Sequence, residues 1–250
     1  MNVLEIQNLS RHFGGLKAVD DITTHVGEGE LVGLIGPNGA GKTTLFNLIS
    51  GFTPVSGGKV RFRGEDITGQ KPFAIAKRGM SRTFQNLRIF PNMTVFDNVS
   101  VGALGATGMN FFQSIAGGRK RAETISEASW KALEMTGLTE VADDLAANLS
   151  YGRRKYLEIA RALAMDPQFL ILDEPAAGLN DTETAELATF VKQLNADGLP
   201  IMLVEHDMNL VMSICERVVV IASGRKIADD VPSVVRNDPV VLEAYLGGDE

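Results

Sequence analysis

The chain has 250 residues, enough for one large domain or for one domain with an inserted subdomain. Charged residues make up 22% and apolar residues 44%, as in an ordinary globular protein, and the net charge of −7 argues against a broad nucleic-acid-binding surface. The single cysteine, Cys215, excludes an internal disulfide framework, and no apolar run approaches the ~20 residues of a membrane helix, so any function at a membrane is expected to be peripheral.

The N-terminal third predicts an antiparallel sheet beside one buried strand. Alternating apolar and polar residues indicate the strands of the sheet, whereas the uninterrupted apolar run Leu31–Ile35 is typical of a strand buried on both faces. A turn that carries Phe13 is expected at Arg11–Gly15. We expect strands at Val3–Leu9, Leu31–Ile35 and Lys59–Phe62, and a pair of strands within Leu16–Val26, interrupted near Asp20 and Asp21.

The stretch after the buried strand has the pattern G-x-x-x-x-G-K-T and leads into a helix-like segment. Glycines let such a loop turn tightly and direct backbone N–H groups at phosphate oxygens, and the following helix adds the positive end of its dipole. Lys42 would reach the β- and γ-phosphates, and Thr43 would ligate Mg²⁺. The residues expected to bind a nucleoside triphosphate are Gly36, Pro37, Asn38, Gly39, Ala40, Gly41, Lys42, Thr43 and Thr44. Alone, this phosphate loop leaves a kinase, a GTPase and an ATPase open.

The middle of the chain changes from strands to helices. Pro72–Lys77 predicts a short helix, because proline is tolerated in a first turn, and Ser81–Gln85 predicts a core strand. A loop is expected at Asn86–Asn98. Val99–Asn148 has a helical pattern, most clearly at Ala122–Met135, but is expected to divide into two or three helices at its glycines. These glycines are Gly102, Gly105, Gly108, Gly117 and Gly118.

Apolar strands alternate with amphipathic helices in the second half of the chain. We expect strands at Phe169–Asp173, Pro200–Val204 and Arg217–Ile221, and helices at Leu149–Leu163, Thr182–Leu194 and Ser233–Leu246. Strands and helices that alternate around a phosphate loop favour an α/β fold with a parallel sheet. We interpret residues 1–250 as a single domain, with a nucleotide-binding core of residues 1–90 and 150–250 and a helical subdomain of residues 91–149.

Two acids follow the apolar run Phe169–Leu172. Asp173 ends the expected strand, and Glu174 comes directly after it. Asp173 would hold Mg²⁺ directly or through water, opposite Thr43. Glu174 stands beside it and would orient and deprotonate a water near the γ-phosphate. The alternative interpretation is a solvated acid pair at the end of a strand.

Five motifs then follow one another in a recognisable order and together resemble the nucleotide-binding subunit of an ABC transporter. Besides the phosphate loop and the acid pair, they are Gln85, the signature Leu149–Arg153 and His206. The resemblance implies a P-loop NTPase with a RecA-like parallel sheet, an antiparallel β subdomain and an inserted helical subdomain. It also implies an ATPase that binds ATP and Mg²⁺.

The same resemblance implies roles for further residues. Ser150 and Gly152 would contact the γ-phosphate of ATP bound to the opposite subunit, although Ser150 is also explained as a helix N-cap. His206 would hydrogen-bond the γ-phosphate. Gln85 would sense Mg²⁺ and the attacking water, and would link the core to the helical subdomain. Phe13 stands where an aromatic ring stacks on adenine, with core packing as the alternative.

Three residues depart from the family pattern. The usual signature is Leu-Ser-Gly-Gly-Gln, but here Tyr151 and Arg153 replace its third and fifth residues, and what they do is left open. Asn180 stands where the family usually has aspartate, which puts in doubt a charged contact across the dimer, although asparagine can still form hydrogen bonds. Because Ser150 and Gly152 are kept, we expect a competent signature.

A narrower resemblance is to the ATPases that power import of branched-chain and other hydrophobic amino acids. It is carried by Arg82–Phe90 with Met93–Val95, by Pro175–Asn180, and by the ending Arg236–Gly247. It implies two transmembrane permease subunits, a second identical or different ATPase subunit, an extracytoplasmic solute-binding protein as an indirect partner, and a peripheral location on the cytoplasmic face of the membrane.

Other functions stay open beside this one. Urea or amide importers and lipopolysaccharide-export ATPases share parts of the same pattern. A soluble ABC ATPase that acts on nucleic acid or ribosomes is disfavoured, because this sequence has one cassette, a short helical insert and an acidic balance. The signature and His206 weigh against a small-molecule kinase.

Overall fold

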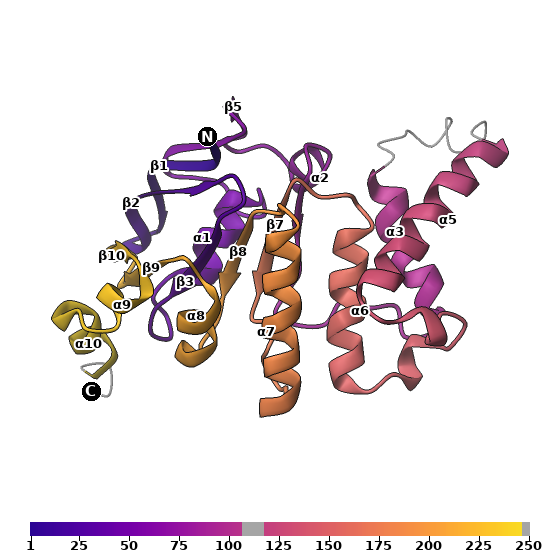
Figure 1. Cartoon of the computed structure of the whole chain (residues 1–250). Coiled ribbons are helices and arrows are strands. Elements are labelled where there is room, and N and C mark those ends of the chain that lie inside the picture. Colours follow the sequence, from indigo (N-terminus) through magenta and orange to yellow (C-terminus); the bar gives the residue numbers. More distant parts are fainter. Residues whose placement is uncertain (107–117, 247–250) are drawn as a thin grey trace.

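The computed structural model describes residues 1–106 and 118–246, which form two sheets and the helices around them (Figure 1). The first sheet is antiparallel and has the order β2-β1-β4-β5. Its strands are β1 (Asn2–Phe13), β2 (Leu16–Gly27), β4 (Gly57–Phe62) and β5 (Glu65–Asp66). The predicted antiparallel β subdomain is therefore present.

The second sheet has the order β10-β9-β3-β8-β7-β6 and is parallel except for β10, which pairs antiparallel with β9. Its strands are β3 (Leu31–Ile35), β6 (Met80–Arg82), β7 (Phe169–Asp173), β8 (Ile201–Val204), β9 (Arg217–Ala222) and β10 (Arg225–Asp230). Strands β3, β7 and β8 are buried along their whole length, as their apolar runs predict. The parallel core of the predicted fold class is confirmed.

Helices cover the parallel sheet and extend beyond its β6 edge. They are α1 (Lys42–Ile49), α2 (Pro72–Ala76), α3 (Val95–Ala106), α5 (Gly118–Met135), α6 (Tyr151–Leu163), α7 (Asp181–Ala196), α8 (Met208–Ile214), α9 (Pro232–Val235) and α10 (Pro239–Leu246), with 3-10 turns η1 (Thr139–Val141) and η2 (Ala146–Asn148). Helices α3 and α5 lie at the opposite end of the molecule from β1, β2 and α10 (Figure 1). Within the described residues, none of these helices has the length and apolarity needed to span a bilayer.

Three expectations for strands were wrong. The strand expected at Val3–Leu9 is the longer β1, which ends at Phe13, so Phe13 ends a strand and only Gly14 and Gly15 remain of the turn expected at Arg11–Gly15. The expected pair of strands within Leu16–Val26 is one continuous strand, β2, because Asp21 takes a left-handed conformation (φ 61°) at a shift of register and the pairing with β1 resumes beyond it. The expected strand Ser81–Gln85 ends at Arg82, so Gln85 lies in the segment after β6 and not within it.

The helical region also begins earlier than expected. Helix α3 starts at Val95, inside the expected loop, and continues through Gly102 and Gly105, which were expected to break it. A Cβ added to Gly102 would lie 2.1 Å from the carbonyl oxygen of Arg161 in α6. Gly102 therefore lets two helices approach closely, which a sequence pattern cannot distinguish from a break. Gly108 and Gly117 lie outside the described residues.

Alternate residues of the parallel strands face two separate apolar clusters. Val32 and Leu34 pack with α1 and the antiparallel sheet, whereas Leu31 and Ile35 pack with α6, α7 and α8. Cys215 belongs to the second cluster, and burial raises the pKa of its thiol to about 12. The single cysteine is thus a buried apolar group, and the functional residues lie at the carboxyl ends of the strands between the two clusters.

Candidate nucleotide site

The loop between β3 and α1 is shaped by glycines that no other residue could replace. Gly36, Gly39 and Gly41 all have positive φ (155°, 76° and 103°). A Cβ at Gly36 would lie 2.0 Å from the carbonyl oxygen of Ile221, and one at Gly41 would lie 2.3 Å from that of Ala18. The backbone of this loop is therefore held against β2 and the β9–β10 hairpin. Residues 38–44 line a cavity of about 640 Å³.

Lys42 places a cation at the base of this cavity. Its side chain is buried, and its ammonium donates hydrogen bonds to the carbonyl oxygens of Gly36 (2.5 Å) and Pro37 (3.0 Å). Burial lowers the pKa of Lys42, while the nearby Glu174 carboxylate favours its charged form. The ammonium is thus held inside the loop that has the sequence pattern of a triphosphate site.

Glu174 connects two other residues on the same cavity. Its carboxylate accepts a hydrogen bond from Gln85 Nε2 (2.8 Å) and one from His206 Nε2 (2.6 Å). Gln85, Glu174 and His206 follow β6, β7 and β8, so they come from the carboxyl ends of three strands of the parallel sheet. Glu174 is buried and has a left-handed backbone (φ 50°), which is uncommon outside glycine and often found at functional sites.

Asp173 does not line the cavity, because its carboxylate is engaged on the other side. Its Oδ2 accepts a hydrogen bond from Arg82 Nη2 (2.6 Å), and the two side chains are only 4% and 6% exposed. Arg82 also donates to Asn47 Oδ1 (2.8 Å) and Ser50 Oγ (3.1 Å) on α1. Arg82 was not predicted as a site residue. A cation in a strand expected to be buried does, however, indicate a buried partner of opposite charge.

The residues fit a magnesium nucleotide. Thr43 lines the cavity, and hydroxyl and carboxylate oxygens are among the ligands that Mg²⁺ prefers. Among the described residues no three His, Cys, Asp or Glu side chains gather as a metal site, so an ion bound here would complete its shell from water and phosphate oxygens. The glycine cradle and the Lys42 ammonium supply what a triphosphate needs.

Phe13 forms the far wall of the cavity together with Leu16, Lys17 and Ala18. Its ring is 48% exposed, which excludes the core-packing alternative, and the Arg11 guanidinium lies 4.4 Å from the ring centroid. The position suits stacking on a flat base.

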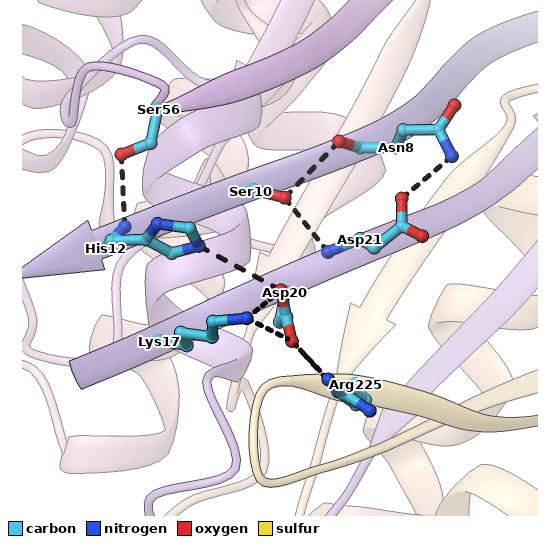
Figure 2. A network of polar contacts seen from close by, with 8 residues as sticks. All are labelled: Asn8, Ser10, His12, Lys17, Asp20, Asp21, Ser56 and Arg225. Atoms are coloured by element: carbon cyan, nitrogen blue, oxygen red, sulfur yellow. Dashed lines mark hydrogen bonds and ion pairs between the residues drawn. The ribbon is translucent and has the colours of Figure 1, made fainter. Parts of the chain in front are cut away.

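A polar network that includes Lys17 of this wall joins β1, β2 and β10 (Figure 2). Asp20 accepts hydrogen bonds from Lys17 (3.4 Å) on its own strand and from Arg225 Nη2 (2.7 Å) at the start of β10. The Arg225 hydrogen bond is the largest cause that lowers the pKa of the Asp20 carboxyl. Asp21 in turn bonds through its amide to Ser10 Oγ (3.0 Å). The two sheets are therefore joined beside the cavity.

Ser150 and Gly152 lie apart from the other predicted site residues and do not line this cavity. Ser150 is the N-cap of α6, where its hydroxyl accepts a hydrogen bond from the Arg153 amide (3.3 Å), so the N-cap interpretation is confirmed. Ser150 is nevertheless exposed. A Cβ at Gly152 would lie 2.7 Å from Glu183 Oε1, so a larger residue here would displace the Glu183 side chain.

Two of the departures from the family pattern have partners within the chain. The Tyr151 hydroxyl donates to the carbonyl oxygen of Ala177 (3.2 Å). Asn180 caps α7 in a reciprocal capping box with Glu183, because each side chain accepts from the other residue's amide (3.0 Å in both directions). In the described part of the chain, no contact explains why arginine stands at position 153.

Comparison with known proteins identifies the family of the chain. Residues 19–177 match the family described as ABC transporter, and residues 225–250 match the family described as branched-chain amino acid ATP-binding cassette transporter. The chain is 43% identical to the high-affinity branched-chain amino acid transport ATP-binding protein BraF of Pseudomonas aeruginosa, over 98% of both sequences. It is 41% identical to LivG of Escherichia coli K12, a protein with the same description, again over 98% of both.

Solved structures show the same likeness. The ADP conformation of an ATP-binding cassette of an ABC transporter has a TM-score of 0.87 and 33% identity, and the match covers 99% of each chain. A nucleotide-free cassette has a TM-score of 0.86 and 32% identity, over 98% of this chain and 99% of that one. The chain therefore belongs to the ABC transporter family, as an ATP-binding subunit that hydrolyses ATP.

Proposed function

We propose that this ATPase powers import of branched-chain or other hydrophobic amino acids through a membrane permease. The proposal rests on relatives that are similar over their whole length and are described as branched-chain amino acid transport ATP-binding proteins. The C-terminal match over residues 225–250 supports the same subfamily. Urea or amide import and lipopolysaccharide export are the competing assignments.

Two ATPase subunits face each other head to tail in the proposed assembly, with ATP between the phosphate loop of one chain and the signature of the other. One observation carries this arrangement: Ser150 is exposed at the start of α6, yet neither it nor Gly152 lines the cavity that holds Lys42 and Glu174. A helix N-terminus with a hydroxyl suits a phosphate oxygen, so a second chain is needed to complete each site.

Within one site, the residues have separate roles. Residues 36–44 cradle the triphosphate, Lys42 neutralises the β- and γ-phosphates, and Phe13 stacks on the adenine. Thr43 and Gln85 would ligate the Mg²⁺ ion, and Asp173, which does not line the cavity, would hold it through water. The ion would neutralise charge on the phosphate oxygens.

Glu174 acts as the base that takes a proton from the attacking water, which then displaces ADP from the γ-phosphorus. Its two carboxylate oxygens are held by Gln85 and His206, and all three residues line the cavity. During the reaction the His206 side chain exchanges its hydrogen bond with Glu174 for one with the γ-phosphate, and so keeps the phosphate in line with the attacking water. Loss of the phosphate contacts after hydrolysis then reopens the pair of subunits.

Residues 91–149 are proposed as the helical subdomain that transmits closure to the membrane. The segment from Asn86 to Met93 is the proposed contact with a cytoplasmic helix of the permease. It is tied to α6, because the Phe84 amide donates to Glu158 (3.2 Å) and Arg161 donates to the carbonyl oxygen of Arg88. Two permease subunits, a second ATPase and, indirectly, an extracytoplasmic solute-binding protein complete the system, with this chain on the cytoplasmic face of the membrane.

Replacing Ser150 by arginine tests the cross-dimer site. The long cation would block the signature surface, so hydrolysis by assembled subunits should fall by at least about 10²-fold, the usual scale for losing a positioned group. Binding of a fluorescent ATP analogue to the monomer should be unchanged, because the phosphate loop is remote from Ser150. Equal loss of monomer binding would contradict the arrangement.

Partners from native membranes test the transport role. The tagged chain, purified after gentle solubilisation, should carry polytopic permease subunits and an ATPase subunit, and vesicles containing that complex should take up a branched-chain amino acid in an ATP-dependent way. Uptake of urea or an amide instead would replace the solute assignment. Recovery with ribosomal or other soluble partners alone would favour the nucleic-acid alternative.

A further inference from the structure

Tyr151 fits against the turn that follows Glu174 in the same chain. Besides the hydrogen bond from its hydroxyl to Ala177, its ring lies against Gly178, where an added Cβ would be 2.9 Å from the Tyr151 Cε1 atom. Gly178 has φ 83°, a conformation that other residues rarely adopt. The aromatic ring and the glycine turn are thus matched in shape. A glycine at position 151, which the family usually has, could make neither contact.

Lys155 lies one helical turn after Tyr151 and reaches Glu174 itself. Its side chain is 2% exposed, and its ammonium donates to the main-chain carbonyl oxygen of Glu174 (3.1 Å). The same ammonium lies 5.8 Å from the centroid of the Tyr151 ring. Burial lowers the pKa of Lys155, whereas the carboxylates of Glu158, Glu205, Glu174 and Asp173 favour its charged form. Burying a cation costs free energy, so the position of Lys155 against Glu174 indicates that it has a role there.

These contacts make a strut, defined here as Tyr151 and Lys155, between the N-terminus of α6 and the segment Glu174–Gly178. Glu174 needs such support, because its φ of 50° is disfavoured for a residue with a side chain. The neighbouring turn is itself anchored on the opposite side, where Glu205 Oε1 accepts the Ala176 amide (2.6 Å). Movement of the α6 N-terminus is therefore transmitted to the Glu174 backbone.

We infer that Tyr151 and Lys155 are positioning residues through which the signature helix of each chain sets the Glu174 carboxylate of that same chain. The inference rests on the proposed function. In the proposed dimer, the signature of a chain contacts one nucleotide, while its Glu174 acts on the other. The strut then couples the two sites: ATP seated on a signature steadies the base of the second site.

The monomer provides the first test. Tyr151→Phe keeps the ring and removes the hydrogen bond to Ala177. Amide hydrogen exchange at residues 174–179 should become about fivefold faster, as expected for the loss of one hydrogen bond, while affinity for a fluorescent ATP analogue stays the same. Tyr156→Phe is the matched control: it removes a hydroxyl from the same helix, on a residue whose ring centroid lies 5.5 Å from that of Phe190 in α7.

Mixed dimers provide the second test. Each dimer combines two differently tagged chains, one of which carries Glu174→Gln, so that only the site using the other chain's Glu174 hydrolyses ATP. In the first arrangement, Tyr151→Phe is on the chain that keeps Glu174, so the altered strut is the one beside the working base. In the second arrangement, Tyr151→Phe is on the Glu174→Gln chain, whose signature faces the working site. The strut predicts a loss of turnover of about tenfold in the first arrangement and little loss in the second. Lys155→Met should behave in the same way.

The outcomes separate the strut from the proposed function. Equal loss in both arrangements, or loss only when the variant signature faces the working site, would overturn the inference, because Tyr151 would then act across the dimer. The cross-dimer function itself fails if Ser150→Arg removes ATP binding by the monomer. If mixed dimers without any change at position 151 are already inactive, the uncleaved ATP of the Glu174→Gln site holds the pair closed, and turnover cannot compare the two arrangements. Hydrogen exchange then decides alone: faster exchange in Tyr151→Phe but not in Tyr156→Phe supports the strut, and unchanged exchange overturns it.

Discussion

Replacing Glu174 by glutamine should lower ATP turnover by about 10²–10⁴-fold, the range for loss of a general base. The amide is nearly the same size and can still pair with Gln85 and His206, the two partners of the carboxylate. It cannot take a proton from water. ATP binding should therefore persist, and gel filtration with ATP and Mg²⁺ should reveal a stable dimer that the parent protein forms only transiently.

The control for this variant is Asp181→Asn. It makes the same change of charge at an exposed acid in the first turn of α7, seven positions further along the chain. Its only expected effect is a small loss of helix stability, because an acid in a first turn favours the helix dipole. If Glu174→Gln hydrolyses ATP at the parent rate, another group is the base. The geometry would then leave His206 as the first residue to examine.

The parts of the fold that could be predicted are those set by local pattern. Continuous apolar runs give β3 and β7, and the change from strand to glycine loop to helix gives the phosphate loop. Runs of only four or five apolar residues are short for a buried helix, which favours a strand buried on both faces. The parallel order of the strands follows from helices between them. The family, which the comparisons confirm, was predicted from the order of five motifs and not from any single motif.

The features that were missed depend on contacts between distant residues. The bulge at Asp21 is stabilised by a hydrogen bond to Ser10 on the neighbouring strand. Gly102 sits inside a helix because α6 approaches it, and Tyr151 has a partner only because α6 begins beside the turn after Glu174. Spacing within one element cannot reveal a partner on another. Lys155 did leave a signal, since it lies four residues before Ile159 on a buried stripe of α6.

Arg82→Met should cost about 3–5 kcal/mol of the free energy of unfolding, the usual cost of removing one partner of a buried ion pair. Methionine fills most of the space but leaves the Asp173 carboxylate, which is 4% exposed, without its cation. It also removes the donor to Asn47 and Ser50. Urea denaturation should show a lower midpoint with an unchanged slope, as a change in stability alone requires.

An exposed ion pair between the segment before β6 and strand β5 provides the matched control. Arg78 bonds Glu65 in a pair whose side chains are 38% and 65% exposed, so Arg78→Met should cost no more than about 1 kcal/mol.

The double variant Arg82→Met/Asp173→Leu separates stability from catalysis. With both charges gone the buried site is apolar, so much of the lost stability should return, because replacing a buried pair by apolar residues is often neutral. ATP turnover should nevertheless be lost in the double variant, since Asp173 is the proposed Mg²⁺ ligand. A double variant that is as unstable as Arg82→Met would mean that Arg82 acts through α1 and the aromatic rings of Phe46 and Phe84 near its guanidinium, and not through the acid of the metal site.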